Sequence, residues 1–254
     1  MFVGVFIVCA MWEFYAPRRA LSLTRWLRWT NNLGLVGFNT LSVMLFMPLV
    51  AVDVAMLIEQ SNLGLMHWLG LPLWLNIFIA VVILDLAIYG QHVLFHFVPW
   101  LWRLHRVHHA DQDIDVTTGV RFHVLEIVLS LFYKITLVAV LGVSVWGVIV
   151  FEILLNASAM FNHSNGRLSN SWDAALRRYI VTPDMHRVHH STRPQETHSN
   201  FGFCLSIWDR FFHTYVAQPK CGHQDMQIGL PIFRVPREQR VDYMLTQPFR
   251  RPKG

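Results

Sequence analysis

The sequence predicts an all-α integral membrane protein with about four transmembrane helices, including a hairpin at residues 125–161, and a polar helical cap. Of the 254 residues, 54% are hydrophobic and only 15% are charged, whereas about 25% are charged in a typical soluble protein. Several apolar runs reach the roughly 20 residues that a membrane-spanning helix needs. No strand-period alternation is strong, and these features exclude a soluble enzyme, a disordered chain and a coiled coil.

The net charge of +5 has a membrane explanation, because cytoplasmic loops collect Lys and Arg. We therefore expect no nucleic acid partner. The three cysteines, Cys9, Cys204 and Cys221, form no CxxC pair and no regular spacing, so a disulfide framework is not indicated.

The first apolar run, residues 2–12, is about half the length of a span. It fits either a truncated span or an interfacial helix that continues to Tyr15. A signal peptide is less favoured, since no basic segment precedes the run and no small-residue cleavage site follows it. Residues 17–30 then form a basic interface segment with four arginines and two tryptophans.

Three longer runs follow. Residues 33–58 carry Asp53 as their one charge, and residues 71–98 carry Asp85 as their only acid. The stretch 125–161 is long enough for two spans or one re-entrant hairpin that turns near Gly142. After Asn162 the chain stays polar and contains seven of the 14 histidines.

The distribution of arginine orients these runs. The segment 17–30 is expected on the cytoplasmic side, and the loop 59–70, which has no Lys or Arg, on the outer side. Every histidine cluster then falls on the cytoplasmic face, near the membrane interface.

Histidine spacing is the strongest chemical signal. The run H-V-L-F-H places residues i and i+4 on one helix face, and two further runs read H-R-V-H-H. In each of these, the outer pair shares a face and the third ring points about 100° away, toward a second metal or a second side of the same site. With one histidine from F-N-H-S-N, the candidates are His92, His96, His105, His108, His109, His163, His186, His189 and His190.

Nine clustered imidazoles exceed the needs of one metal and suggest two; imidazole suits Fe, Zn, Cu and Ni. Unrelated surface histidines are a weaker explanation for three such clusters on one face of the membrane. Four other residues are candidates to support the ligands or contact them: Asp85, which could accept the second N–H of a ligand histidine, Asp111, which could orient His109 or be a helix cap or solvated acid, His123 and Asn165. Glu126 is a further acid that could tune the metals.

These motifs resemble the fatty acid hydroxylase superfamily, also called the sterol desaturase family. The resemblance runs from about residue 13 to 215 and rests on D-L-A-I-Y-G-Q-H-V-L-F-H, L-W-R-L-H-R-V-H-H-A-D, R-F-H-V-L-E, F-N-H-S-N, T-P-D-M-H-R-V-H-H-S and N-F-G-F-C-L-S-I-W-D-R-F-F-H-T-Y. Val124, Phe201 and His213 depart from the family pattern, where Pro, Tyr and Gly are usual. The resemblance divides the chain into N-terminal transmembrane helices (1–98), a catalytic region (99–215) and a basic cytoplasmic C-terminal tail (216–254).

The resemblance implies a membrane-bound non-haem di-iron oxygenase with the nine histidines as ligands. Its cofactors would be two iron ions, with zinc able to replace them in recombinant protein, and O2 would be the co-substrate. The substrate would be a membrane lipid, such as a fatty acyl chain, sterol or isoprenoid, that is hydroxylated or desaturated at an unactivated C–H. Because no haem, iron–sulfur or dinucleotide motif is present, a separate ferredoxin or cytochrome would supply electrons. The alternative is a metal-binding or lipid-binding membrane protein without oxygenase activity.

Overall fold

The computed structural model describes residues 1–251, and all regular elements in that part of the chain are helices. The only β-type contacts among these residues are three isolated bridges. Four segments are long and apolar enough to cross a membrane: Arg25–Trp68, Leu73–Phe97, Val124–Leu141 and Val145–His163. The predicted all-α architecture with four candidate transmembrane segments is confirmed.

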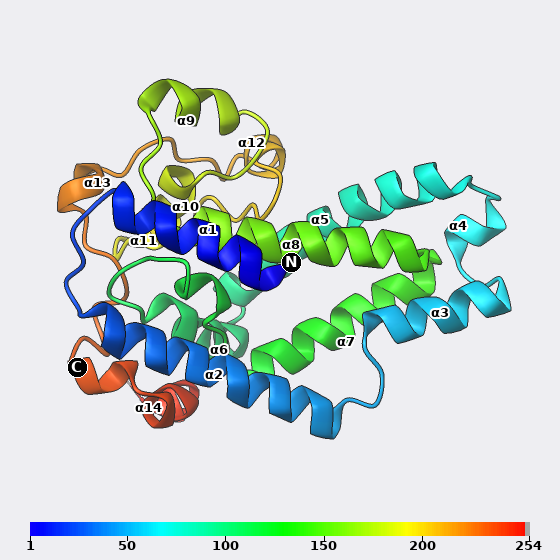
Figure 1. Ribbon diagram of the computed structural model, residues 1–254, viewed down its shortest axis with the longest axis horizontal. Helices are drawn as coiled ribbons and strands as arrows, with labels where there is room; N and C mark the ends of the chain where they lie inside the picture. Colours follow the sequence, from blue (N-terminus) through cyan, green and yellow to red (C-terminus); the bar gives the residue numbers. More distant parts are fainter. Residues whose placement is uncertain (252–254) are drawn as a thin grey trace.

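The four segments run lengthwise through the molecule (Figure 1). The first contains α2 (Arg25–Phe46), α3 (Ala51–Ser61) and the short α4 (Leu65–Trp68). The chain then returns along α5 (Leu73–Phe97), and α7 (Val124–Leu141) and α8 (Val145–His163) form an antiparallel hairpin. Helix α5 packs mainly against α8, and α3 contacts both α7 and α8.

A break at residues 47–50 divides the apolar run 33–58 into two helices, where the sequence predicted one continuous run. Pro48 explains the break: it has no backbone N–H to donate, and it pushes the preceding residue out of the helical region. Met47 accordingly has φ −114° and ψ 100°, which are extended backbone angles. The break interrupts the wall of the helical bundle in the middle of the first segment.

The turn between α7 and α8 lies where the sequence predicted it, at Gly142. This residue ends α7 with φ +70°, a conformation that glycine adopts at little cost. The amide of Asn76 on α5 fixes the turn, because it donates to the Gly142 carbonyl at 3.2 Å and accepts from the Ser144 N–H at 3.0 Å.

Helix α1 (Phe2–Tyr15) lies beside α8 near the end of the bundle that carries the cap. Its Glu13 is buried and accepts hydrogen bonds from the backbone N–H groups of Val116 and Asn165, at 2.7 and 2.8 Å. The carboxylate therefore connects the N-terminal helix to two loops of the cap.

The cap consists of short elements between and after the long helices: α6 (Pro99–His109), η1 (Thr118–Val120), α9 (Asn170–Leu176), α10 (Pro183–His189), α11 (Pro194–Thr197), α12 (Ile207–Phe211), α13 (Gly222–Asp225), η2 (Pro236–Gln239), α14 (Val241–Thr246) and η3 (Gln247–Phe249). The C-terminal elements pack on α2 and α6. There Gln239 and Met244 are fully buried, and Gln239 accepts from buried Arg121 at 2.6 Å. The cap therefore includes the C-terminal elements as part of its packed structure.

Candidate metal centre

The structure brings all nine candidate histidines together at the junction of the bundle and the cap. Two groups form, and within each group one nitrogen from every ring lies within 4.8 Å of all the others. All nine side chains are buried. The first group contains His92, His96, His105, His109 and His189, and the second contains His108, His163, His186 and His190.

Each H-x-x-H-H run supplies both groups. On α6, His105 and His109 are four residues apart and share the five-histidine group, while His108 belongs to the four-histidine group. At α10 the pattern is exchanged: the i,i+4 pair joins the four-histidine group, and His189 joins the other. The side-chain directions follow from helical spacing, as the sequence predicted. The two groups lie side by side, because the rings of His109 and His190 stack with their ring centroids 4.6 Å apart.

Protein acceptors fix the tautomers of two ring pairs. In the five-histidine group, His92 Nδ1 lies 2.9 Å from the Phe201 carbonyl and His105 Nδ1 lies 2.6 Å from a Glu126 carboxylate oxygen. The Phe201 carbonyl can only accept, so His92 Nδ1 carries the proton, and an ionised Glu126 likewise accepts from His105 Nδ1; each Nε2 then carries a lone pair. These two Nε2 atoms nevertheless face each other at 3.2 Å.

The second pair has the same arrangement. His108 Nδ1 lies 3.2 Å from the Arg121 carbonyl and His163 Nδ1 lies 2.7 Å from the Ala159 carbonyl, while the two Nε2 atoms are 3.1 Å apart. Two lone pairs at this distance repel each other unless a cation lies between them. The arrangement therefore favours a metal ion over a hydrogen-bonded histidine network.

The remaining rings support the same interpretation. Both nitrogens of His96, His109 and His190, together with Nε2 of His189, are buried without a hydrogen-bond partner, and such atoms are costly unless something binds them. For a metal–nitrogen distance of about 2.1 Å, neighbouring ligand atoms lie about 3.0–3.4 Å apart. The observed Nε2 separations of 3.0–3.2 Å match this geometry.

Burial also sets the protonation of the cap histidines. It lowers the pKa of His105 to about 3. Burial, and then the neighbouring imidazoles, hold the pKa of His108, His109, His186 and His190 well below the usual range. These rings are neutral near pH 7, the form in which a histidine binds a metal.

Glu126, in the first turn of α7, is the acid that contacts a candidate ligand. It accepts from His105 Nδ1, and its second oxygen is buried without a partner. The sequence identified Glu126 only as one of several acids that could tune the metals. A carboxylate behind a metal-binding imidazole raises its basicity and fixes its orientation, and the i,i+3 spacing from His123 in R-F-H-V-L-E is the available sequence signal.

Asp85 has a different role from the one expected. Instead of contacting a histidine, it accepts from the backbone N–H groups of Cys204 and Leu205 at 3.1 Å and from the indole N–H of Trp208 at 2.9 Å. It therefore connects α5 to the 203–208 segment, close to the Phe201 carbonyl that binds His92.

Asp111 is neither a partner of His109 nor a solvated acid. It forms a buried bidentate ion pair with Arg28, at 2.8 Å for both contacts, and also accepts from Thr118. The Arg28 guanidinium overcomes the effect of burial and lowers the pKa of Asp111 to about 2. The pair joins α2 to the loop that follows α6.

His123 and Asn165 support the backbone and belong to neither histidine group. His123 caps α7 by accepting from the Leu125 N–H. Asn165 accepts from the Arg19 N–H at 3.2 Å and donates to the Arg19 carbonyl at 2.8 Å, which is a loop-holding role. Of the remaining histidines, His213 has φ +58°, which explains why glycine is usual at that position in the family that the motifs resemble.

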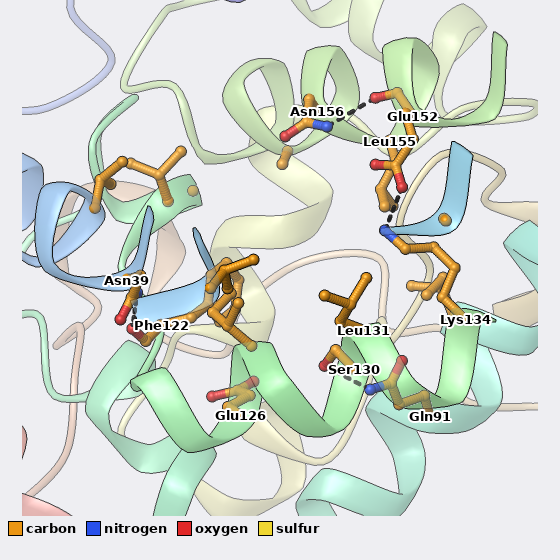
Figure 2. Close-up of a pocket in the computed structure, with 18 of the residues that line it drawn as sticks. Asn39, Gln91, Phe122, Glu126, Ser130, Leu131, Lys134, Glu152, Leu155 and Asn156 are labelled. Carbon is orange, nitrogen blue, oxygen red and sulfur yellow. Dashed lines mark hydrogen bonds and ion pairs between the residues drawn. The ribbon is translucent and has the colours of Figure 1, made fainter. Parts of the chain in front are cut away.

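A cavity of about 680 Å³ reaches the five-histidine group from within the bundle. Most of its lining comes from α2, α3, α5, α7 and α8, and it includes His92 on α5 and His105 on α6. Met44 and Val50, on either side of the α2–α3 break, line the cavity and are also exposed, by 75% and 40%. The cavity therefore extends from the exposed apolar surface at the α2–α3 break to the histidines, and Figure 2 shows part of its wall.

The family model for fatty acid hydroxylase matches residues 77–214, which contain all nine histidines. The chain is 28% identical over 160 residues to alkylglycerol monooxygenase of Homo sapiens, covering 63% of this chain and 34% of that protein. It is 29% identical over 161 residues to ornithine lipid hydroxylase OlsE of Rhizobium tropici, covering 62% and 46%. It is 25% identical over 175 residues to cholesterol 25-hydroxylase of Rattus norvegicus, covering 61% and 55%.

The chain thus spans between about a third and about half of the length of these relatives. No solved structure matches it. The match of the family model covers more than half of the chain and extends from α5 to the residues after α12. This chain belongs to the fatty acid hydroxylase family.

Proposed function

We propose that this protein is a membrane-bound di-iron oxygenase that hydroxylates or desaturates an unactivated C–H of a lipid. The observation that carries the proposal is the pair of histidine groups with Nε2 lone pairs facing each other at 3.1–3.2 Å, beside a cavity that reaches the lipid-facing surface. Relatives named as lipid hydroxylases and monooxygenases support it. Two irons bound by the nine histidines would supply O2 activation and hydrogen abstraction from the lipid.

The residues of the chain contribute positioning and exclusion of water. The Phe201, Arg121 and Ala159 carbonyls and the Glu126 carboxylate hold the imidazoles in the Nε2-binding tautomer. The cavity wall brings the lipid carbon to the face formed by His92 and His105. In a hydroxylation, one oxygen atom of O2 enters the C–H bond and the other leaves as water, which requires two electrons and two protons.

The electrons come from a separate donor of the ferredoxin or cytochrome type in this proposal. We infer from the arginine-rich segment 17–30 that the histidines lie on the cytoplasmic side, where they would meet such a donor. The single observation that favours the second candidate, a metal-binding protein without oxygen chemistry, is that neither histidine group includes a carboxylate among residues 1–251.

The test uses the full chain in lipid nanodiscs, loaded with ferrous iron and supplied with a chemical reductant and isotopically labelled O2. An alkylglycerol, an ornithine lipid and cholesterol serve as candidate substrates. The proposal predicts a lipid product carrying one labelled oxygen atom, or a lipid lacking two hydrogens, that is absent with His108→Ala. Full iron loading without any O2-dependent product from these lipids or from total membrane lipid would favour the second candidate.

A further inference from the structure

The cavity contains a polar region deep in the span, away from the histidines. Lys134 on α7 and Glu152 on α8 form an ion pair there and both line the cavity. Figure 2 shows the two side chains meeting at one side of the cavity, with Glu126 on the same α7 helix well apart from them. Charged groups in the middle of a transmembrane helix are costly and commonly mark a functional site.

The Lys134–Glu152 pair has free hydrogen-bonding capacity toward the cavity. The side chains are 14% and 30% exposed, and a lysine ammonium has three N–H donors whereas an ionised carboxylate accepts at two oxygens. The pair itself uses one ammonium–oxygen contact. The remaining ammonium N–H groups and carboxylate lone pairs of this partly exposed pair can therefore bind a polar group in the cavity.

Neighbouring polar side chains extend this region. Ser130, one turn before Lys134 on α7, accepts from the Gln91 amide at 2.6 Å. Asn156, one turn after Glu152 on α8, donates to the Glu152 carbonyl at 2.8 Å. All five side chains line the cavity, and we define them as the polar subsite.

We infer that the polar subsite binds the uncharged hydroxyl group of a long lipid alcohol, with the hydrocarbon body directed toward the histidines. A hydroxyl can accept from the Lys134 ammonium and donate to the Glu152 carboxylate at the same time. A lipid carboxylate can accept from Lys134 but meets a like charge at Glu152, and a lipid ammonium can donate to Glu152 but meets a like charge at Lys134, so neither matches both groups. An alkane would occupy the same volume without satisfying the pair.

The spacing along α7 sets the length of the lipid. Lys134 follows Glu126, the partner of His105, by eight residues, or about 12 Å of helix. With carbon–carbon bonds of about 1.5 Å in a zigzag, that distance corresponds to roughly ten carbons. This inference rests on the proposed function and specifies its substrate class: an alcohol oxidised about ten carbons from its hydroxyl group.

The test measures binding to the metal-free full chain in nanodiscs, so that it does not depend on oxygenase activity. Radiolabelled 1-dodecanol is the probe, and unlabelled 1-dodecanol, dodecane, dodecanoate and dodecylamine compete with it. Two hydrogen bonds to charged groups should favour the alcohol over dodecane by roughly 100- to 10,000-fold. A wild-type protein that binds dodecane, dodecanoate or dodecylamine as well as the alcohol would overturn the inference.

Substitutions localise the effect. Lys134→Met with Glu152→Leu removes both charges without leaving one unpaired, and the alcohol preference should fall below about 3-fold. Thr136→Val is the matched control, since it removes a hydroxyl from the same helix at a position that donates to the Phe132 carbonyl and does not line the cavity. It should retain the full preference.

If the double variant does not fold, the exchange Lys134→Glu with Glu152→Lys keeps both charges and should keep the preference. An unchanged preference in a folded double variant, or a lost preference in Thr136→Val, would contradict the assignment. Because metal is absent, failure of the proposed oxygenase activity leaves these binding results intact. Conversely, an active oxygenase without alcohol preference would eliminate only the polar subsite.

Discussion

Replacing Glu126 by glutamine tests how the protein prepares one histidine for metal binding. The glutamine oxygen can still accept from His105 Nδ1, now 2.6 Å from the carboxylate with both side chains nearly fully buried, but the negative charge is lost. A hydrogen bond to a charged group contributes about 1.5–3 kcal/mol and a neutral one about 0.5–1.5 kcal/mol. The difference of about 1–2 kcal/mol predicts roughly 5- to 30-fold weaker metal binding at the five-histidine group.

The assay titrates metal-free protein with ferrous iron or cobalt against a competing chelator and resolves two binding steps. Glu59→Gln is the control, because Glu59 accepts from the Val145 N–H at 2.9 Å near the α7–α8 turn, at the other end of the bundle. Only one step should weaken in Glu126→Gln, since its partner belongs to one histidine group. Unchanged binding at both steps, or equal weakening of both in a folded variant, would refute the reasoning.

Three further substitutions test the supports of the site. Asp85→Asn replaces an acceptor of three hydrogen bonds by a group that also donates, and should lower stability by about 2 kcal/mol or more, seen as a lower midpoint of thermal unfolding. Gly119→Ala places a Cβ 2.5 Å from a backbone carbonyl and 3.2 Å from His163 Nδ1, and should lower metal occupancy of the four-histidine group in elemental analysis. Gly166→Ala places a Cβ 2.2 Å from an indole ring and should destabilise the protein by about 1–3 kcal/mol, whereas Gly37→Ala, with nothing within 4 Å, should not.

Local spacing determines what the sequence could reveal of this protein. The long apolar runs and Gly142 predicted the spans and the hairpin because membrane length and positive φ act on consecutive residues. The i,i+3 and i,i+4 histidines predicted shared helix faces for the same reason. Pro48 indicates the break in the run 33–58, but the hydropathy of the run does not, because the residues on both sides of the break are apolar.

Long-range pairing could not be predicted in this way. By position in the sequence, Asp85 and Asp111 are equally plausible partners for histidines. In the structure Asp85 instead binds the 203–208 segment and Asp111 binds Arg28, and each of these contacts joins residues 80 or more positions apart. The Phe201 carbonyl that fixes His92 is a backbone atom, which no residue pattern identifies. The Lys134–Glu152 pair appeared in the sequence only as interruptions of an apolar stretch.

The most direct measurement of the central claim is the number of transition-metal ions bound per chain. We predict two in the wild-type protein, one in His109→Ala and one in His190→Ala, because these stacked residues belong to different groups. Elemental analysis of detergent-purified protein gives the count whichever metal the cells supply. A wild-type protein with one ion or none, or variants that both retain two ions, would contradict the assignment of two separate histidine-bound metals.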